Sequence, residues 1–381
     1  MEINKPADIV FALTGDVRRN SRAIRQLRAL GDRGLRIIVL SVAAQDAVPL
    51  EIANAELRLI EPPPGSGPSF FRGVHRLVAR SAEQIPAHVY HASDLYVLPA
   101  LSSAARKHRA KLAYDARELY PHVASTVGRP WVRYFWRTVE GRFIKRADAV
   151  FSVSESIAEK LVDMYGIRRP TVIYNIPEAR EVSPTNALRE RAGLQLDDLV
   201  VLHQGQMRPN RGCEKLVDAM RDVDTAVLVF LGDGPLKELL AALARGLGIR
   251  DRIRFIEPVP PDELLSYTAS ADVGVTLLED VCLNHRFALP NKLFEYLVAG
   301  IPVVASDIPE VRRIVLGFDV GLVVDPQNRE DLVAALRQST IDKTLREKWR
   351  RNIPKVLETF NSERTSQDFL RVYDDLLLTT R

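Results

Sequence analysis

The residues most suited to chemistry lie in the segment LPNKLFEYLVAGIPVVAS, Leu289 to Ser306. Pro290 is typical of a first helical position, where its missing N–H costs nothing, and Gly300 is typical of the residue just past a helix end. We therefore expect a helix of about ten residues to begin near Pro290. Its free N–H groups and positive dipole end form an anion site, to which Lys292 adds a full charge. Glu295 suits hydroxyl groups such as those of a ribose, so the pair describes a nucleotide; the alternative is a surface helix whose charges face water.

These side chains need a framework, and alternating apolar and amphipathic stretches predict parallel sheets covered by helices. Continuous Val, Ile and Leu runs are typical of buried parallel strands, and they restart after the polar, proline-interrupted connection at 175–197. We therefore predict two doubly wound α/β domains, residues 1–178 and 185–360, with a helix at 361–381 folding back onto the first. Ligands bind at the carboxyl ends of strands in such sheets, so the cleft between the domains is the expected site. The predicted strands are residues 8–13, 35–42, 87–92, 110–116, 148–154, 198–205, 225–232, 252–259, 271–278, 301–307 and 320–326.

The composition limits the partners and the compartment. The chain has 381 residues and a formal charge of +4, from 53 basic and 49 acidic side chains. This excess is too small to indicate nucleic acid as a partner, although it is compatible with an anionic ligand. The two cysteines, Cys213 and Cys282, show no disulfide or metal-ligand spacing. Because neither a leader pattern nor a long apolar run is present, we expect a cytoplasmic location, with peripheral contact at the inner membrane face as an alternative.

Several stretches together resemble one known family. ALPNKLFEYLVAGIPVVASDIPE (288–310) resembles the donor-binding segment of the retaining glycosyltransferases of family 4. HQGQMRPNRGCEKLVDAM (203–220) is similar to the strand, basic loop and helix that open the second domain of that family, and residues 228–278 follow its pattern. VYHASDLYVLPAL (89–101) and YDARELYPH (114–122) resemble its acceptor-side segments. The resemblance implies the GT-B fold, in which two Rossmann-like domains face each other across a cleft.

The resemblance also implies donor-binding positions in the second domain. Glu295 corresponds to the glutamate that binds the ribose hydroxyls, and Arg211 and Lys292 match basic positions beside the diphosphate. Pro258 and Val259 end the strand against which the nucleobase packs. The full set of candidate donor-binding residues is Gly205, Arg208, Arg211, Gly232, Gly234, Pro258, Val259, Leu289, Asn291, Lys292 and Glu295.

The candidates for catalysis come from the first domain. They are His91, Asp94, Arg117 and Glu118. Arg117 replaces a histidine that is common in the family, and it cannot act as a base because it is permanently protonated. It could instead hold the leaving diphosphate or an anionic acceptor. The alternatives are that Asp94 and Glu118 only cap helices and that His91 is a buried imidazole of the core.

The basic and aromatic stretch 129–151 allows two interpretations. Val132, Phe135, Trp136, Val139 and Phe143 recur at helical spacing, which predicts a helix with this stripe facing the core and its basic residues outside. The alternative is that the basic face lies near anionic lipid head groups, where surface charges add up.

The resemblance implies transfer of a sugar from a nucleotide-diphosphate donor to an acceptor hydroxyl, with retention at the anomeric carbon. The acceptor would be a glycan, a lipid-linked molecule or a small glycoside precursor. No metal and no further cofactor is expected, because cations and a helix end can stabilise the leaving diphosphate. One alternative is a catalytically weak nucleotide-sugar-binding subunit, since Phe287 and Gln206 stand where many relatives have a glutamate and an arginine. Another is a sugar-nucleotide epimerase or phosphorylase on the same architecture.

Overall fold

The computed structural model describes residues 6–45, 49–178, 182 and 185–378. The chain forms two compact units: unit 1 comprises Met1–Asn175 with Glu363–Arg381, and unit 2 comprises Ile176–Ser362. Part of the predicted connection at 175–197 lies outside the described residues. Within the described ranges, no helix is both long enough and apolar enough to cross a membrane.

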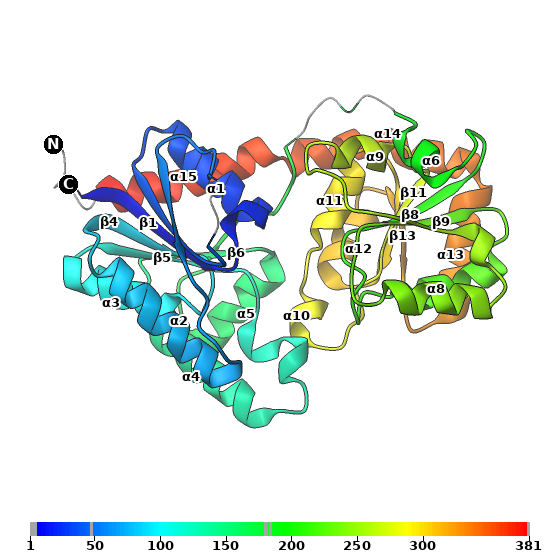
Figure 1. Cartoon of the computed structure of the whole chain (residues 1–381). Helices are drawn as coiled ribbons and strands as arrows, with labels where there is room; N and C mark the ends of the chain where they lie inside the picture. Colours follow the sequence, from blue (N-terminus) through cyan, green and yellow to red (C-terminus); the bar gives the residue numbers. More distant parts are fainter. Residues whose placement is uncertain (1–5, 46–48, 179–181, 183–184, 379–381) are drawn as a thin grey trace. The chain divides into compact units, whose positions relative to one another are not determined.

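Unit 1 is built on a parallel sheet with the strand order β3-β2-β1-β4-β5-β6-β7 (Figure 1). Its inner strands are apolar runs that are covered on both sides, and every residue of β2 is buried. The predicted set did not include β3 and β7. The first is an edge strand in which charged and apolar residues alternate, and the second has two residues. The strands are β1 (Ala7–Thr14), β2 (Ile37–Val42), β3 (Ala55–Ile60), β4 (Ala87–Ala92), β5 (Lys111–Ala116), β6 (Ala149–Ser152) and β7 (Thr171–Val172).

Helices cover both faces of the unit 1 sheet. The first and last helices of the chain, α1 and α15, lie against one face, and α2, α3 and α4 lie against the other (Figure 1). The start of α1 is fixed by Asn20, whose side-chain oxygen accepts a hydrogen bond from the N–H of Ala23. The helices are α1 (Ser21–Asp32), α2 (Gly67–Ala82), α3 (Leu98–His108), α4 (Pro130–Ile144), α5 (Glu155–Tyr165) and α15 (Ser362–Leu378).

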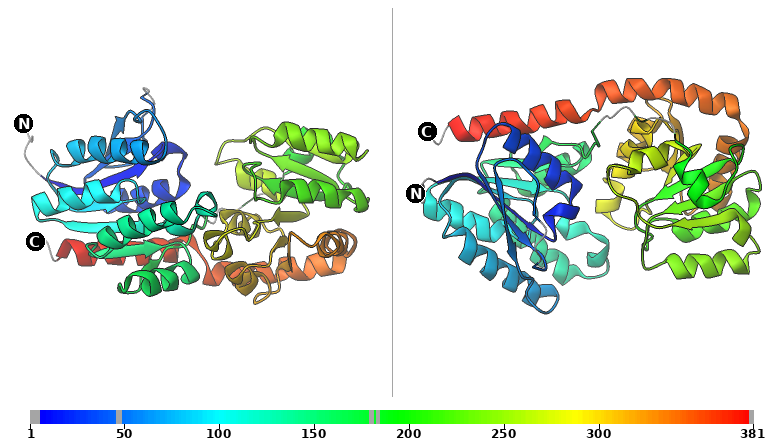
Figure 2. Two further views of the ribbon diagram at one scale, coloured as in Figure 1. Left: turned by 90° about the horizontal axis from the view of Figure 1, so that it is seen from below. Right: turned by 45° about the horizontal axis from the view of Figure 1, so that its top comes forward.

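The C-terminal helix α15 completes the core of unit 1. Its Phe369 and Tyr373 are buried in one cluster with Phe11 and Phe151 of the sheet and Leu27 of α1. Figure 2 shows α15, in red, running alongside α1, in blue. Residues at opposite ends of the sequence therefore share one core.

Helix α4 differs from the interpretation that favoured a core helix. Val132 and Phe135 are exposed, whereas the buried residues of α4 are Glu140 and Ile144. The reason is that full cover is confined to the C-terminal half of α4, where Glu140 accepts hydrogen bonds from the hydroxyls of Tyr114 (2.8 Å) and Tyr165 (2.7 Å). Periodicity identified the helix, but it could not show where the cover ends.

Unit 2 is a second parallel sheet, with the strand order β10-β9-β8-β11-β12-β13. All of these strands fall within stretches predicted from the sequence. They are β8 (Val200–Gln204), β9 (Val227–Leu231), β10 (Ile253–Ile256), β11 (Val273–Thr276), β12 (Val303–Ser306) and β13 (Gly321–Val324). From β8, the strands β9 and β10 are added on one side of the sheet, and β11, β12 and β13 are added on the other side. The strand order therefore reverses between β8 and β11.

Helices also cover the unit 2 sheet. The core on one face is built from the sheet together with α7, α8 and α13, and α11 contacts α9 and α14 (Figure 1). The helices are α6 (Ala187–Ala192), α7 (Cys213–Ala219), α8 (Lys237–Gly246), α9 (Leu264–Ala269), α10 (Leu283–Arg286), α11 (Asn291–Val298), α12 (Pro309–Val315), α13 (Arg329–Ile341) and α14 (Lys343–Thr359).

Candidate functional site

The point at which the strand order reverses marks the candidate site in unit 2. Loops that leave neighbouring strands in opposite directions open a crevice at the carboxyl edge of the sheet, and ligands bind there in open α/β folds. The loops after β8 and β11 flank this point. The first runs through Gly205, Arg208 and Arg211 to α7, and the second leads through Leu289 to α11.

Two glycine-containing loops pack backbone against backbone at this edge. A Cβ on Gly232 would lie 2.3 Å from the carbonyl oxygen of Gly205, and one on Gly234 would lie 2.3 Å from that of Met207. The N–H of Met207 donates to the carbonyl of Asp233 at 3.0 Å. Gly232 and Gly234 also have φ values of +143° and +158°, which residues with a side chain rarely adopt. These glycines are therefore required by close approach, and their presence does not by itself indicate a ligand.

Helix α11 begins one residue later than expected. Pro290 is its N-cap, with extended angles (φ −64°, ψ 134°), and the helix covers eight residues. Gly300, with φ +77°, follows the C-cap Ala299 as predicted. The N-terminal boundary differs because the ψ angle of Pro290 is extended, so that Asn291 is the first residue of the helix.

Lys292 is held in the first turn of α11 against the end of β8. Its Nζ lies 3.2 Å from Nε2 of His203. Burial is the largest effect on this ammonium and lowers the pKa of Lys292 to about 8, with Arg211 acting in the same direction and Glu295 opposing. Burial, followed by the charges of Lys292 and Arg211, also holds the pKa of His203 well below its usual range. His203 is therefore neutral, and its Nε2 accepts a hydrogen bond from the Lys292 ammonium.

Glu295 lies one turn further along the same face of α11. The side-chain amide of Gln204 donates to its Oε2 at 2.5 Å, and Thr268 Oγ1 donates to Oε1 of Gln204 at 2.7 Å. The hydroxyl of Tyr296 accepts the backbone N–H of Gln204 at 3.1 Å. These contacts fix the carboxylate at the carboxyl end of β8, so α11 brings Lys292 and Glu295 to the same strand.

The other predicted donor-side residues flank this arrangement. Arg208, Arg211, Pro258 and Asn291 are exposed, whereas Val259, which follows β10, and Leu289 are half-buried. Each lies in a segment that follows a strand of unit 2, as expected for a site at this edge. Lys215, on α7, forms an ion pair with Glu279 at 2.8 Å.

Sequence reasoning missed three residues of this arrangement: His203, Gln204 and Thr268. His203 and Gln204 are the last two residues of β8, and both are buried. Two adjacent polar residues at the end of an apolar strand could have identified His203 and Gln204 as site residues from the sequence. Thr268 lies in α9, far away in the sequence, and gave none.

In unit 1 the strand order reverses between β1 and β4, and Asp94 joins the two strand ends. Its Oδ2 accepts the N–H of Thr14 at 2.6 Å, and its Oδ1 accepts the N–H of Val97 at 3.2 Å, just before α3. Burial raises the pKa of Asp94, against these hydrogen bonds and the charge of Arg117. Half-buried Arg117 and exposed Glu118 follow β5 at the same edge.

His91 lies apart from the other catalytic candidates. Its ring is fully buried and stacks on Phe11 with centroids 4.3 Å apart, and its Nδ1 is 2.7 Å from the hydroxyl of Tyr373. Burial lowers the pKa of His91 to about 3. The structure therefore brings Asp94, Arg117 and Glu118 to one edge and places His91 in the core beneath α15.

A buried ion pair between α1 and β5 lies near the carboxyl edge of the unit 1 sheet. The guanidinium of Arg22 donates to both carboxylate oxygens of Asp115 at 2.7 Å, and Gln26 adds a third hydrogen bond at 2.9 Å. Burial opposes the charge of Asp115, but Arg22 outweighs it and the pKa falls to about 2. Among the described residues, no three His, Cys, Asp or Glu side chains form a group that could hold a metal ion.

Comparisons with known proteins agree with this architecture. The family model described as Glycosyl transferases group 1 matches residues 184–356, and the model described as Glycosyl transferase 4-like domain matches residues 7–175. A D-inositol 3-phosphate glycosyltransferase from Acidothermus cellulolyticus is 28% identical over 261 residues, which are 64% of this chain and 56% of that protein. The lipopolysaccharide core biosynthesis glycosyltransferase LpsD from Rhizobium meliloti is 29% identical over 225 residues, 58% of this chain and 62% of that protein. The alignments thus span less than two thirds of these relatives.

Solved structures support the fold over nearly the whole chain. Sucrose-phosphate synthase from Thermosynechococcus elongatus aligns with a TM-score of 0.81 at 17% identity, covering 98% of this chain and 100% of that one. Anabaena Alr3699/HepE, in complex with UDP-glucose, aligns with a TM-score of 0.75 at 16% identity, covering 97% and 100%. The prediction of two Rossmann-like α/β domains is confirmed, and the chain belongs to the glycosyl transferases group 1.

Proposed function

We propose that the protein is a glycosyltransferase that binds a nucleotide-diphosphate sugar at the carboxyl edge of the unit 2 sheet and transfers the sugar to an acceptor hydroxyl. The observation that carries the proposal is the placement of Lys292 and Glu295, three residues apart on α11, against the last residues of β8. A cation beside a helix N-terminus suits a diphosphate, and a fixed carboxylate suits the hydroxyls of a ribose.

The leaving group is a nucleoside diphosphate, so the main requirement is to stabilise negative charge that develops on it. Lys292 and the first-turn N–H groups of α11 are fixed before the reaction and do not need to reorganise, which makes such stabilisation effective. Arg208 and Arg211, on the loop after β8, add positive charge. The proposal needs no metal ion and no further cofactor.

Retention at the anomeric carbon belongs to the same proposal. No protein nucleophile is assigned; an oxygen of the leaving diphosphate takes the proton of the acceptor hydroxyl as that hydroxyl attacks from the same side. Asp94, Arg117 and Glu118 line the unit 1 edge and are proposed to orient the acceptor. The anomeric configuration of the product, measured by nuclear magnetic resonance, tests this part.

The substrates are proposed by class. The structural neighbour that holds UDP-glucose makes uridine diphosphate sugars the first donors to test. The inositol phosphate and lipopolysaccharide core relatives favour a glycan, a lipid-linked molecule or a small polyol as acceptor. Synthesis of a surface polysaccharide, lipid-linked glycan or glycoside in the cytoplasm, with peripheral contact at the inner membrane face, completes the proposal.

The test is donor binding by calorimetry with uridine, guanosine and adenosine diphosphate sugars. Glu295→Ala removes a charged acceptor of the ribose hydroxyls and should weaken binding by roughly 1.5–3 kcal/mol. Glu238→Ala, an exposed glutamate on α8, is the matched control and should bind donors as the wild type does. Unchanged donor affinity in Glu295→Ala would refute the assignment.

A second assay separates the enzyme from a binding subunit of the same fold. Release of nucleoside diphosphate that requires an acceptor supports transfer. Donor binding without release across glycan, lipid-linked and polyol acceptors would instead identify a catalytically weak paralogue.

A further inference from the structure

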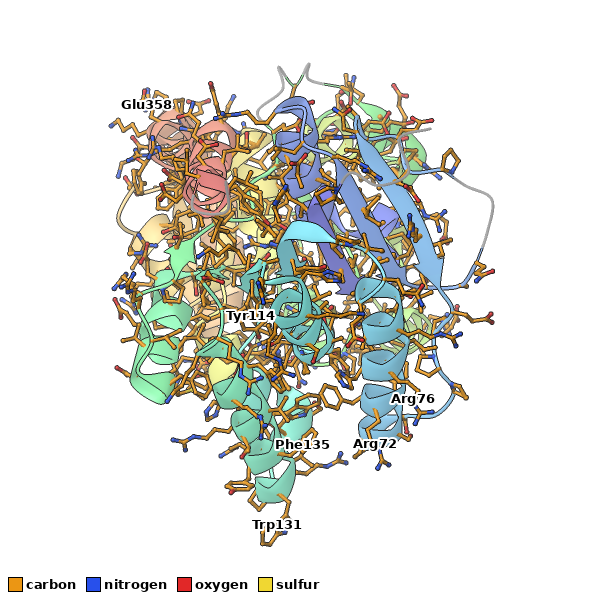
Figure 3. The ribbon with its side chains drawn as sticks, turned by 90° about the vertical axis from the view of Figure 1, so that its left-hand side faces the viewer. Arg72, Arg76, Tyr114, Trp131, Phe135 and Glu358 are labelled. Carbon is orange, nitrogen blue, oxygen red and sulfur yellow. The ribbon has the colours of Figure 1, made fainter. Side chains whose placement is uncertain are left out.

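The N-terminal half of α4 presents large apolar side chains to solvent. Trp131 is 85% exposed and Tyr134 is 70% exposed, and Val127, Val132 and Phe135 beside them are also exposed. We call these five residues the α4 face. Figure 3 shows Trp131 at the protruding end of α4, with Phe135 further along the helix. Single exposed apolar residues are common, but a cluster of this kind marks an interaction site.

Arginines surround the α4 face. Arg129, Arg133 and Arg137 are exposed in and beside α4, and Arg72 and Arg76 are exposed on α2. The two helices are in contact here, because Phe71 of α2 packs against Phe135 and Trp136 with ring centroids 5.7 and 5.3 Å apart. Figure 3 shows Arg72 and Arg76 at the same end of unit 1 as Trp131.

The charge of this region is uncompensated. The sequence contains no Asp or Glu in residues 62–82 or in residues 119–139. No carboxylate among the described residues forms an ion pair with any of the five arginines. The surface therefore combines aromatic rings with arginines that have no ion-pair partner in the part of the chain that the structure describes.

We infer that the α4 face and its five arginines dock on an anionic lipid bilayer. Trp and Tyr rings favour the boundary between head groups and acyl chains, where one part of the ring is apolar and another is hydrated. Arginines attract anionic head groups, and several acting together give a stable contact. The inference assigns the α4 face and its arginines to the membrane contact that the proposed function includes. It rests on the proposed function only for the reason why the protein would bind a membrane.

The charge pattern disfavours a second copy of the chain as the occupant. A symmetric dimer would place the same patch of both copies face to face. Five arginines from each copy would then meet without intervening carboxylates, and like charges in an interface oppose association.

The opposite end of α4 allows the face to be changed without unfolding the helix. Glu140 is buried and is hydrogen-bonded to Tyr114 and Tyr165, whereas Trp131, Val132, Tyr134 and Phe135 of the α4 face lie in the other half of the helix, and Val127 precedes it. Substitutions at exposed positions of this half should leave the anchor intact.

The experiment is co-sedimentation of the full chain with phosphatidylcholine vesicles, with and without phosphatidylglycerol. The arginine variant carries Arg129→Gln, Arg133→Gln and Arg137→Gln, and its matched control carries Arg106→Gln, Arg245→Gln and Arg351→Gln at exposed positions elsewhere. The aromatic variant carries Trp131→Ser and Tyr134→Ser, and its control is Leu239→Ser, 53% exposed on α8.

We expect the wild type and both controls to bind vesicles that contain phosphatidylglycerol, and to bind less at high salt. The arginine variant should bind roughly 100-fold more weakly. The aromatic variant should lose roughly 10-fold, because less apolar surface leaves water. Brominated lipids should quench the fluorescence of the wild type more than that of Trp131→Phe, which places the ring in the bilayer.

Absence of wild-type binding to anionic vesicles would overturn the inference, as would equal binding by the variants and their controls. Self-association that both α4 variants abolish, without vesicle binding, would show instead that the face joins copies of the chain. Donor affinity measured on the same samples keeps the two proposals separate. A chain that binds vesicles but no donor refutes the proposed function alone, and the reverse result refutes this surface alone.

Discussion

The carboxyl edges of the two sheets use their charged residues differently, although the strand order reverses at the same place in both. In unit 1, the buried carboxylate of Asp115 is neutralised by Arg22 of the same unit. In unit 2, Lys292 faces the neutral imidazole of His203. The comparison indicates that the strand order determines which edge of a sheet can bind a ligand. The partner of each charged residue then determines whether its charge stabilises the unit or remains available to a ligand.

The largest expected effect tests the unit 1 side of this comparison. Asp115→Ala leaves the Arg22 guanidinium buried and unpaired, so unfolding in urea should show a loss of about 3–5 kcal/mol. Glu56→Ala breaks the exposed pair with Arg58 and should cost less than about 1 kcal/mol. If Asp115→Ala kept its stability but lost donor binding, the carboxylate would belong to the site and the contrast between the edges would fail.

A second prediction extends the comparison to Glu140, a buried unit 1 carboxylate with two tyrosine partners. Burial raises the pKa of Glu140 from 4.5 to about 7, against the hydrogen bonds of Tyr165 and Tyr114. The folded state therefore keeps its proton between these values while the unfolded chain loses it, so stability falls as the pH rises through this window. Relative to Glu140→Gln, the wild type should lose about 3 kcal/mol between roughly pH 4 and pH 8. Parallel pH profiles for the two proteins would contradict the assignment.

The third prediction concerns the availability of Lys292. A bound diphosphate favours the ammonium, whose pKa in the free protein is lowered to about 8 by burial. Donor affinity should therefore be highest below this pH and should fall by up to about tenfold per pH unit above it. Lys292→Arg should flatten the profile, because a guanidinium stays protonated. Calorimetry across this range measures both, and a wild-type profile as flat as that of the arginine variant would remove Lys292 from the anion site.

The smallest effect sharpens the role of Gln204 as a positioning residue. Gln204→Leu removes the amide that holds Glu295, and donor affinity should fall by about 1 kcal/mol. The control is Gln327→Leu, which removes the exposed hydrogen bond from the Gln327 side-chain amide to Glu279. It should leave donor affinity unchanged. Inorganic diphosphate has no ribose, so its binding should be the same in Gln204→Leu and the wild type. An equal loss for both ligands would indicate a general structural defect.

The sequence predicted the parts of the molecule that depend on local pattern. Continuous apolar runs located the strands of unit 2 and the inner strands of unit 1, because burial on both faces leaves few alternatives to Val, Ile and Leu. Edge strand β3 was missed because half-exposed strands need no such run. The exposure of Val132 and Phe135 was missed because helical spacing does not show how far a neighbouring element extends.

Within the site, the helix pattern that begins near Pro290 pointed to Lys292 and Glu295, and the family resemblance agreed. Their contacts with His203, Gln204 and Thr268 could be found only from the structure. Thr268 comes from α9 and reaches Gln204 only when the sheet and its helices are assembled. The lowered pKa of Lys292 likewise depends on burial by residues distant in the sequence. The roles of His91, Asp94, Arg117 and Glu118 in catalysis stay predictions.

The position of α15 has a consequence for the order in which the molecule is made. During synthesis the ribosome releases unit 2 before the residues that cover Phe11 and His91, because α15 follows unit 2 in the chain. The nascent N-terminal half must therefore wait with part of its apolar surface uncovered, and unit 2 is the first to have its complete chain available for folding. The apolar side chains of unit 1 that pack against Phe369 and Tyr373 gain this cover only when α15 has been made.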